Sequence, residues 1–185
     1  SGGFYALTQG YTDLFLGTKP SDDQVQQASE AGVTFSYTPI GQEAFVFIVD
    51  SANPIESLTS EQVRDIYSGA ITNWKDVGGP DEEIVAFQRS AGSGSQSQME
   101  RFMGEVPLAE APEYRTVQSM SGLVGGVADY QNGQGSIGYS FRYYVTDLVG
   151  DYDVKLLAID GVEPTLENIE NGTYPLTGNI VAATR

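Results

Sequence analysis

The sequence predicts an α/β fold, because short apolar segments typical of strands alternate with amphipathic segments typical of helices. Residues 44–49 are continuously apolar, which is typical of a strand buried on both faces of a sheet. Residues 21–31 show a helical pattern: Ser21 is a candidate N-cap, acidic residues follow it, and Gly32 stops the helix. Because strands separated by helices favour parallel pairing, the sheets are predicted to be mostly parallel.

The remaining elements follow in order from the same signals. Strands are predicted where apolar residues cluster or alternate, at 12–16, 33–38, 84–87, 135–140, 154–158 and 174–184. Helices are predicted where apolar residues recur at helical spacing, at 59–67, 94–103, 119–131, 141–148 and 165–171. Asn53-Pro54 ends the buried strand, and either Thr59 or Ser60 caps the helix that follows.

The composition excludes several partners. The chain has 185 residues, a length that suits one domain or two small lobes. Its 25 acidic and 9 basic residues give a net charge of -16, which opposes binding to nucleic acid or to an anionic membrane surface. The acidic residues are spread along the chain, as in a solvated surface.

The absence of cysteine and histidine excludes several kinds of chemistry. A cysteine nucleophile, a Ser-His-Asp triad, a zinc site built on His or Cys, and a haem held by histidine all need one of these residues. No metal and no cofactor is therefore expected. The sequence also contains no apolar run long enough to span a membrane and no signal peptide at its start.

The most informative motif occupies residues 88–97, where a short apolar run leads through Arg89 into a Gly-Ser-Gly-Ser turn and a helix. The first turn of a helix has unpaired N–H groups and partial positive charge, so it attracts anions. Arginine can grip two oxygens at once, and serine hydroxyls add further donors. The motif predicts an anion site; the alternative is a plain surface helix capped by Ser93 or Ser95, with Arg89 solvated.

An ordered series of segments resembles the phosphate-binding proteins of ABC transporters. These segments are 53–59, 66–74, 77–79, Arg89 with 92–95, 135–139 and 160–164. The resemblance implies a two-lobed periplasmic-binding-protein-like (type II) clamp. Its first lobe would comprise residues 1–50 and 135–185, its second lobe residues 51–134, and its hinge strands would lie near 45–50 and 137–141.

The same resemblance implies a function and a location. The chain would capture an inorganic oxyanion, phosphate first, and deliver it to an ABC transporter permease without catalysing a reaction. The protein would work outside the cytoplasm, at the cell surface or in the periplasm, with the full-length form anchored to the membrane.

The resemblance also nominates individual residues. Arg89 corresponds to the arginine that grips the ligand, and Ser93, Gly94 and Ser95 correspond to the donors at the helix N-terminus. Ser1 opens the Ser-Gly-Gly run that begins the binding helix of the first lobe. Thr18 stands where the family has the aspartate that accepts the proton of hydrogen phosphate.

Three departures bear on these expectations. Thr18 carries no charge, and Ala91 replaces the family's aspartate that orients the arginine, which leaves selectivity for phosphate open. The family's strand–helix–strand before Ser1 is also lacking. We expect an incomplete first lobe that needs a missing N-terminal segment or self-associates; the alternative is that other residues fill the gap. A sensor or protein-interaction module with altered anion binding is the alternative function, and an enzyme is a more distant third.

Aromatic residues at 139, 141, 143 and 144 are interpreted as core and hinge packing, with lining of a ligand cleft as the alternative. Trp74 is interpreted as the anchor of a surface loop, with contact to a ligand as the alternative.

Overall fold

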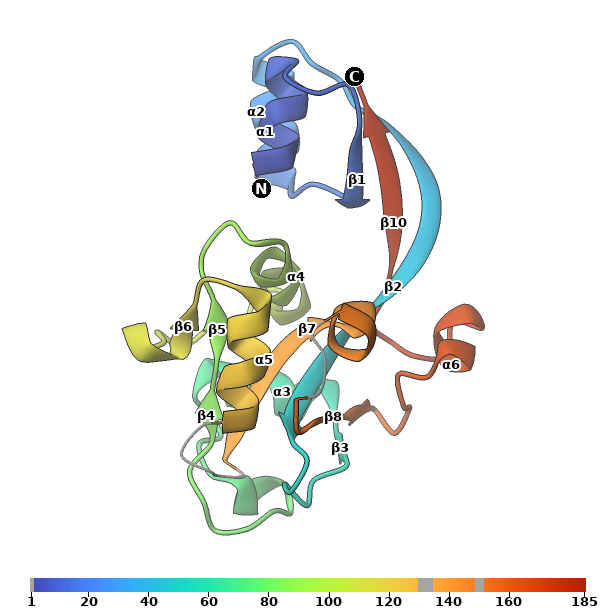
Figure 1. Cartoon of the computed structure of the whole chain (residues 1–185). Helices are drawn as coiled ribbons and strands as arrows, with labels where there is room; N and C mark the ends of the chain where they lie inside the picture. The colour runs from blue at the N-terminus through green and yellow to red at the C-terminus, as the bar shows by residue number, and fades with distance from the viewer. Residues whose placement is uncertain (1, 130–134, 149–151) are drawn as a thin grey trace. The chain divides into compact units, whose positions relative to one another are not determined.

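The computed structural model describes residues 2–129, 135–148 and 152–185. It divides into two compact units (Figure 1), the smaller formed by Ser1–Glu43 with Gly178–Arg185 and the larger by Ala44–Thr177. None of the described helices combines the length and hydropathy that a bilayer span requires.

The smaller unit packs two helices on one face of a three-stranded sheet. Its helices are α1 (Gly2–Gln9) and α2 (Asp22–Glu30), and its strands lie in the order β1 (Phe15–Thr18), β10 (Thr177–Thr184), β2 (Ser36–Asp50). β1 and β10 are antiparallel. The apolar core of this unit consists of Phe4, Leu7, Ala28, Phe35 and Ala183.

The sheet of the larger unit is built around the second half of β2, whose residues from Ala44 to Asp50 are all buried. β7 (Ser136–Phe141) and β8 (Val154–Leu156) pair with β2 in antiparallel fashion, and β4 (Val85–Ala86) adds to β7 in parallel. Two short parallel pairs complete the strands: β3 (Ser57–Leu58) with β9 (Ala158–Ile159), and β5 (Gln88–Arg89) with β6 (Thr116–Val117).

Helices surround this sheet. They are α3 (Ser60–Ser68), α4 (Gly94–Met103), α5 (Met120–Asp129) and α6 (Leu166–Glu170), with the 3-10 turns η1 (Trp74–Val77) and η2 (Glu113–Arg115) and the π-helical turn η4 (Tyr144–Leu148). α5 lies along β7 (Figure 1), and Gly138 permits this close approach. A Cβ atom at Gly138 would lie only 2.6 Å from Leu123 Cδ2.

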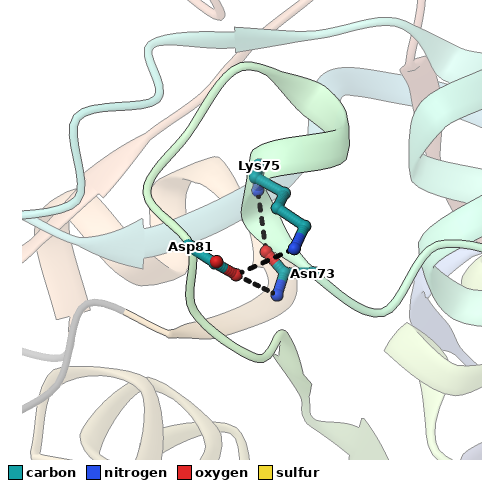
Figure 2. Close-up of polar contacts among 3 residues, drawn as sticks. All are labelled: Asn73, Lys75 and Asp81. Atoms are coloured by element: carbon teal, nitrogen blue, oxygen red, sulfur yellow. Dashed lines mark hydrogen bonds and ion pairs between the residues drawn. The ribbon is translucent and has the colours of Figure 1, made fainter.

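The loop around η1 is held at both ends, as Figure 2 shows. The Asn73 side chain accepts a hydrogen bond from the Lys75 N–H at 3.0 Å and donates to Asp81 Oδ1 at 2.9 Å. Lys75 Nζ reaches the same carboxylate oxygen at 3.1 Å. Trp74 between them is fully buried and donates its indole N–H to Gly135 O at 2.9 Å, which confirms its interpretation as a loop anchor.

The α/β class is confirmed, but the prediction of mostly parallel sheets was wrong. The sheet is mixed, because its longest strand, β2, pairs with both β7 and β8 in antiparallel fashion. The separate strands predicted at 33–38 and 44–49 are one continuous strand. The helix predicted at 141–148 is confirmed over 142–148: Phe141 still belongs to β7, Arg142 and Tyr143 are α-helical, and the rest forms the π-helical turn η4.

The boundaries of the two compact units differ from those of the predicted lobes. Residues 44–50 and 135–177, assigned to the first lobe by the resemblance, cluster with the larger unit. Lobes are defined by a hinge that moves, and contacts in one conformation do not report that movement. The lobes at 1–50 with 135–185 and at 51–134 therefore stay a prediction.

Candidate functional site

The α4 helix begins in a tight turn that directly follows β5. Ser93 is the N-cap, in an extended conformation, and its Oγ accepts from the Gln96 N–H at 3.3 Å. The Ser93 N–H bonds back to Ser90 O at 3.2 Å. Gly92 has φ +81 between them, a conformation that side chains disfavour, so a glycine is needed for this turn. The turn carries the chain from the strand into the helix within four residues, 90–93.

Arg89 ends β5 and is buried, with 9% of its surface exposed. Its Nη1 donates to Ser95 Oγ at 3.0 Å, its Nε to Val117 O at 3.2 Å and its Nη2 to Gln118 O at 3.2 Å. A guanidinium carries more N–H groups than these bonds use, so both terminal nitrogens keep a donor for a ligand. The side chain is thus fixed in direction while it retains capacity to bind.

The groups that orient Arg89 are all uncharged. No carboxylate within 2–129, 135–148 or 152–185 lies at ion-pair distance from its guanidinium. The backbone carbonyls of Val117, which ends β6, and of Gln118 after it therefore orient Arg89. The resemblance implied an aspartate at the place of Ala91 for this role. Because the partners are neutral, the positive charge of Arg89 is left uncompensated and available to an anion.

Burial lowers the pKa of the Arg89 guanidinium, while the nearby phenols of Tyr139 and Tyr144 act in the opposite direction. An arginine stays protonated at neutral pH even after such a shift, because its ordinary pKa is so high. The site therefore holds a fixed positive charge in partly desolvated surroundings.

The first turn of α4 contributes uncommitted donors. The N–H groups of Gly94 and Ser95 have no acceptor inside the helix, and no described residue accepts from them. Gly94 is exposed, Ser93 is half-buried and Ser95 is buried. Ser95 Oγ accepts from Arg89 and keeps its own proton to donate.

Two further residues that the sequence did not nominate take part in this site. The backbone N–H of Arg89 donates to Tyr139 Oη at 2.9 Å and to Gln96 Oε1 at 3.2 Å. Tyr139 Oη in turn donates to Gln96 Oε1. The sequence placed Tyr139 among packing aromatics, with lining of a ligand cleft as the alternative. The Ser-x-x-Gln spacing from Ser93 to Gln96 was the available signal for the glutamine.

Four of the nominated residues therefore come together in the larger unit: Arg89, Ser93, Gly94 and Ser95. Thr18 is the last residue of β1 in the smaller unit and is half-buried. Ser1 lies outside the described residues. Among the residues that the structure describes, no cluster of acidic side chains could hold a metal ion.

The chain matches a family model described as a PBP superfamily domain over residues 1–183. Among curated proteins it is 27% identical to the phosphate-binding protein PstS of Staphylococcus epidermidis over 179 residues, 95% of this chain and 54% of that protein. It is 31% identical to PstS of Bacillus subtilis (strain 168) over 138 residues, 73% of this chain and 43% of that protein. The chain thus spans about half the length of these curated relatives.

Solved structures similar to this chain also include proteins described as phosphate-transport proteins. One is described as a putative phosphate ABC transporter substrate-binding protein with bound phosphate from Clostridium perfringens, with a TM-score of 0.78 at 26% identity, covering 100% of this chain and 71% of that one. Another is an ABC-type phosphate transport receptor from Vibrio cholerae, with a TM-score of 0.75 at 27% identity, covering 99% of this chain and 71% of that one.

Proposed function

The chain belongs to the PBP superfamily, and from this membership we propose that it captures an inorganic oxyanion, with phosphate as the first candidate. The resemblance read from its sequence is confirmed by relatives that carry the name phosphate-binding protein and by a neighbour with bound phosphate. Because those proteins are longer than this chain, the ligand is carried over here as a proposal.

One observation carries this proposal: Arg89 presents an uncompensated charge beside the open first turn of α4. An oxyanion placed there can accept from the spare Arg89 N–H groups, from the N–H groups of Gly94 and Ser95, and from the Ser93 and Ser95 hydroxyls. Each hydrogen bond to a charged group contributes about 1.5–3 kcal/mol. A few of them suffice for micromolar binding, which requires about 8 kcal/mol.

The proposed event is capture and release, in which no covalent bond changes. We propose that the anion is handed to the permease of an ABC importer and that the protein works outside the cytoplasm, anchored to the membrane in its full-length form. The names of the relatives as phosphate-binding and transport proteins support this role.

Selectivity among oxyanions is part of the proposal. The nominated groups of the larger unit are N–H groups and hydroxyls, which can donate to phosphate and to sulfate alike. Phosphate at neutral pH carries a proton that needs an acceptor, and no carboxylate of the described residues lies at ion-pair distance from Arg89 to take that role. We therefore expect a smaller preference for phosphate over sulfate than a carboxylate would give.

Calorimetric titration of the chain with phosphate, with sulfate and with chloride tests the proposal. The expected result is saturable heat with phosphate at micromolar concentration, weaker heat with sulfate and none with chloride. Absence of heat, and of any thermal stabilisation, with every oxyanion at millimolar concentration would contradict oxyanion capture.

A further inference from the structure

Among the residues that the structure describes, three helices begin with the same capping sequence, Ser or Thr followed three residues later by Gln. In α2 the Gln24 side chain returns to the N-cap and accepts from the Ser21 N–H at 3.0 Å. In α3 the Gln62 side chain accepts from the Thr59 N–H at 2.9 Å. Both helices form the complete capping box that this spacing predicts.

The third helix, α4, uses its glutamine differently. Ser93 Oγ accepts from the Gln96 N–H as in the other helices, but Gln96 Oε1 does not return to the Ser93 N–H. That N–H bonds to Ser90 O instead, which releases the glutamine side chain. Gln96 is buried, with 6% of its surface exposed, and its Oε1 accepts from the Arg89 N–H at 3.2 Å and from the Tyr139 hydroxyl.

Tyr139 closes a triangle of hydrogen bonds with these two residues. Its hydroxyl accepts from the Arg89 N–H at 2.9 Å while it donates to Gln96 Oε1. The tyrosine is fully buried on β7, and its ring packs against Phe45 and Tyr67 at centroid distances of 5.6 Å. The triangle thus ties the end of β5 and the first turn of α4 to the central sheet.

We infer that Gln96 and Tyr139 are positioning residues of the oxyanion site. This inference rests on the proposed function and deepens it. The triangle holds the backbone of Arg89 and the first turn of α4 in one fixed relationship, so that the guanidinium and the free helix N–H groups converge on the same anion. Donors fixed in advance bind more tightly, because less conformational freedom is lost on binding. A glutamine used only to cap the helix would serve folding alone.

The chain offers a matched control for each variant. Gln96→Met removes the side-chain oxygen that accepts from the Arg89 N–H. Gln62→Met removes a side-chain oxygen that accepts only from the N-cap of its own helix, Thr59. Tyr139→Phe removes one buried hydroxyl, and Tyr174→Phe removes another, which donates to Phe45 O at 2.9 Å from an equally buried side chain. Tyr139→Phe deletes a single oxygen, so it keeps the test valid if Gln96→Met does not fold.

Phosphate affinity by calorimetry and stability by urea unfolding are measured for all four variants. We expect Gln96→Met and Tyr139→Phe each to raise the Kd about tenfold, the equivalent of one hydrogen bond. The controls should keep the wild-type Kd although they lose comparable stability. A fifth variant combines Gln96→Met with Tyr139→Phe. Its Kd should rise by less than the product of the two single increases, because both residues act through one network. Unchanged affinity in both site variants, or equal losses in the controls, would overturn the inference.

A second readout separates this inference from the proposed function. Hydrogen exchange of the Arg89 backbone N–H, measured by NMR without ligand, should be faster in Gln96→Met and Tyr139→Phe than in the wild type and in both controls. If the wild-type chain binds no oxyanion, the proposed function fails by itself. If the exchange rate of Arg89 is unchanged in both site variants, the positioning role fails whatever the protein binds.

Discussion

Arg89 Nη1 donates to Ser95 Oγ at 3.0 Å, so the arginine that ends β5 is bonded to the first turn of α4. The serine holds the guanidinium and at the same time keeps a proton to donate. Charge, hydroxyl and helix N–H groups are in this way parts of one arrangement. Affinity for an anion should depend on this bond.

Replacement of Ser95 by alanine tests that dependence. Ser95→Ala removes the acceptor of Arg89 Nη1 and one hydroxyl donor, and we expect the Kd for phosphate to rise about tenfold or more. Ser97→Ala is the control, because Ser97 lies two residues further along the same helix and is half-buried. The Kd for phosphate is measured by calorimetry on both variants. Equal Kd values for Ser95→Ala and Ser97→Ala would contradict the role of Ser95.

Arginine and lysine should not be interchangeable at position 89. Arg89→Lys keeps the charge but cannot reach Val117 O, Gln118 O and Ser95 Oγ together as the planar guanidinium does. We expect the Kd for phosphate to rise about a hundredfold, the equivalent of two hydrogen bonds. Arg101→Lys near the C-terminus of α4 is the control. Near wild-type affinity in Arg89→Lys would show that only charge matters at this position.

Part of this site could be predicted from the sequence. Arg89, Ser93, Gly94 and Ser95 were found because they lie within seven residues of one another, where strand, turn and helix N-terminus are all visible locally. Gln96 was not predicted as a site residue, and for Tyr139 packing was preferred to a place in a ligand cleft, because the bond between the two joins positions 43 residues apart. The replacement of an orienting aspartate by the carbonyls of Val117 and Gln118 was hidden for the same reason.

In the fold, too, local features were predicted and contacts between distant residues were not. The N-caps of α2 and α3 are Ser21, as predicted, and Thr59, one of the two residues that the sequence indicated for that helix. Strand direction was predicted wrongly, because alternation of strands and helices does not reveal that β7 and β8 both run antiparallel to β2. Strand neighbours are decided by tertiary packing, which one sequence does not display.

Trp74 should matter for stability and not for binding. Trp74→Phe removes the indole N–H that donates to Gly135 O and part of a fully buried ring, while Gly135 O keeps its bond from the Val85 N–H. We expect a loss of about 1–3 kcal/mol in the free energy of unfolding from the lost hydrogen bond and the space left by the smaller ring. Trp74 is the only tryptophan, so unfolding is followed by circular dichroism instead of fluorescence. An unchanged free energy of unfolding, or a changed Kd for phosphate, would contradict this assignment.

Asp160 should make stability depend on pH. Its carboxylate accepts from the Ser60 hydroxyl at 2.6 Å and from the Ser60 N–H at 2.8 Å, and these bonds lower the pKa of Asp160. A lowered pKa in the folded state stabilises the fold above the ordinary value of 3.8, and this contribution is lost as the pH falls through the folded pKa.

The comparison with Asp160→Asn isolates that contribution. Asparagine tolerates the positive φ of 52 at this position and carries no titrating group. Urea unfolding should show a constant difference in stability between wild type and variant above about pH 5, and a shrinking difference below it. A difference that stays constant down to about pH 3 would exclude Asp160 as the source.

An NMR titration of the isotope-labelled chain with phosphate tests whether an oxyanion is held by Arg89 and the first turn of α4. We expect the largest saturable shifts at the Nη–H groups of Arg89, which keep spare donors, and at the backbone N–H groups of Gly94 and Ser95. Saturable shifts confined to other parts of the chain, with these signals unchanged, would contradict an oxyanion site at this place.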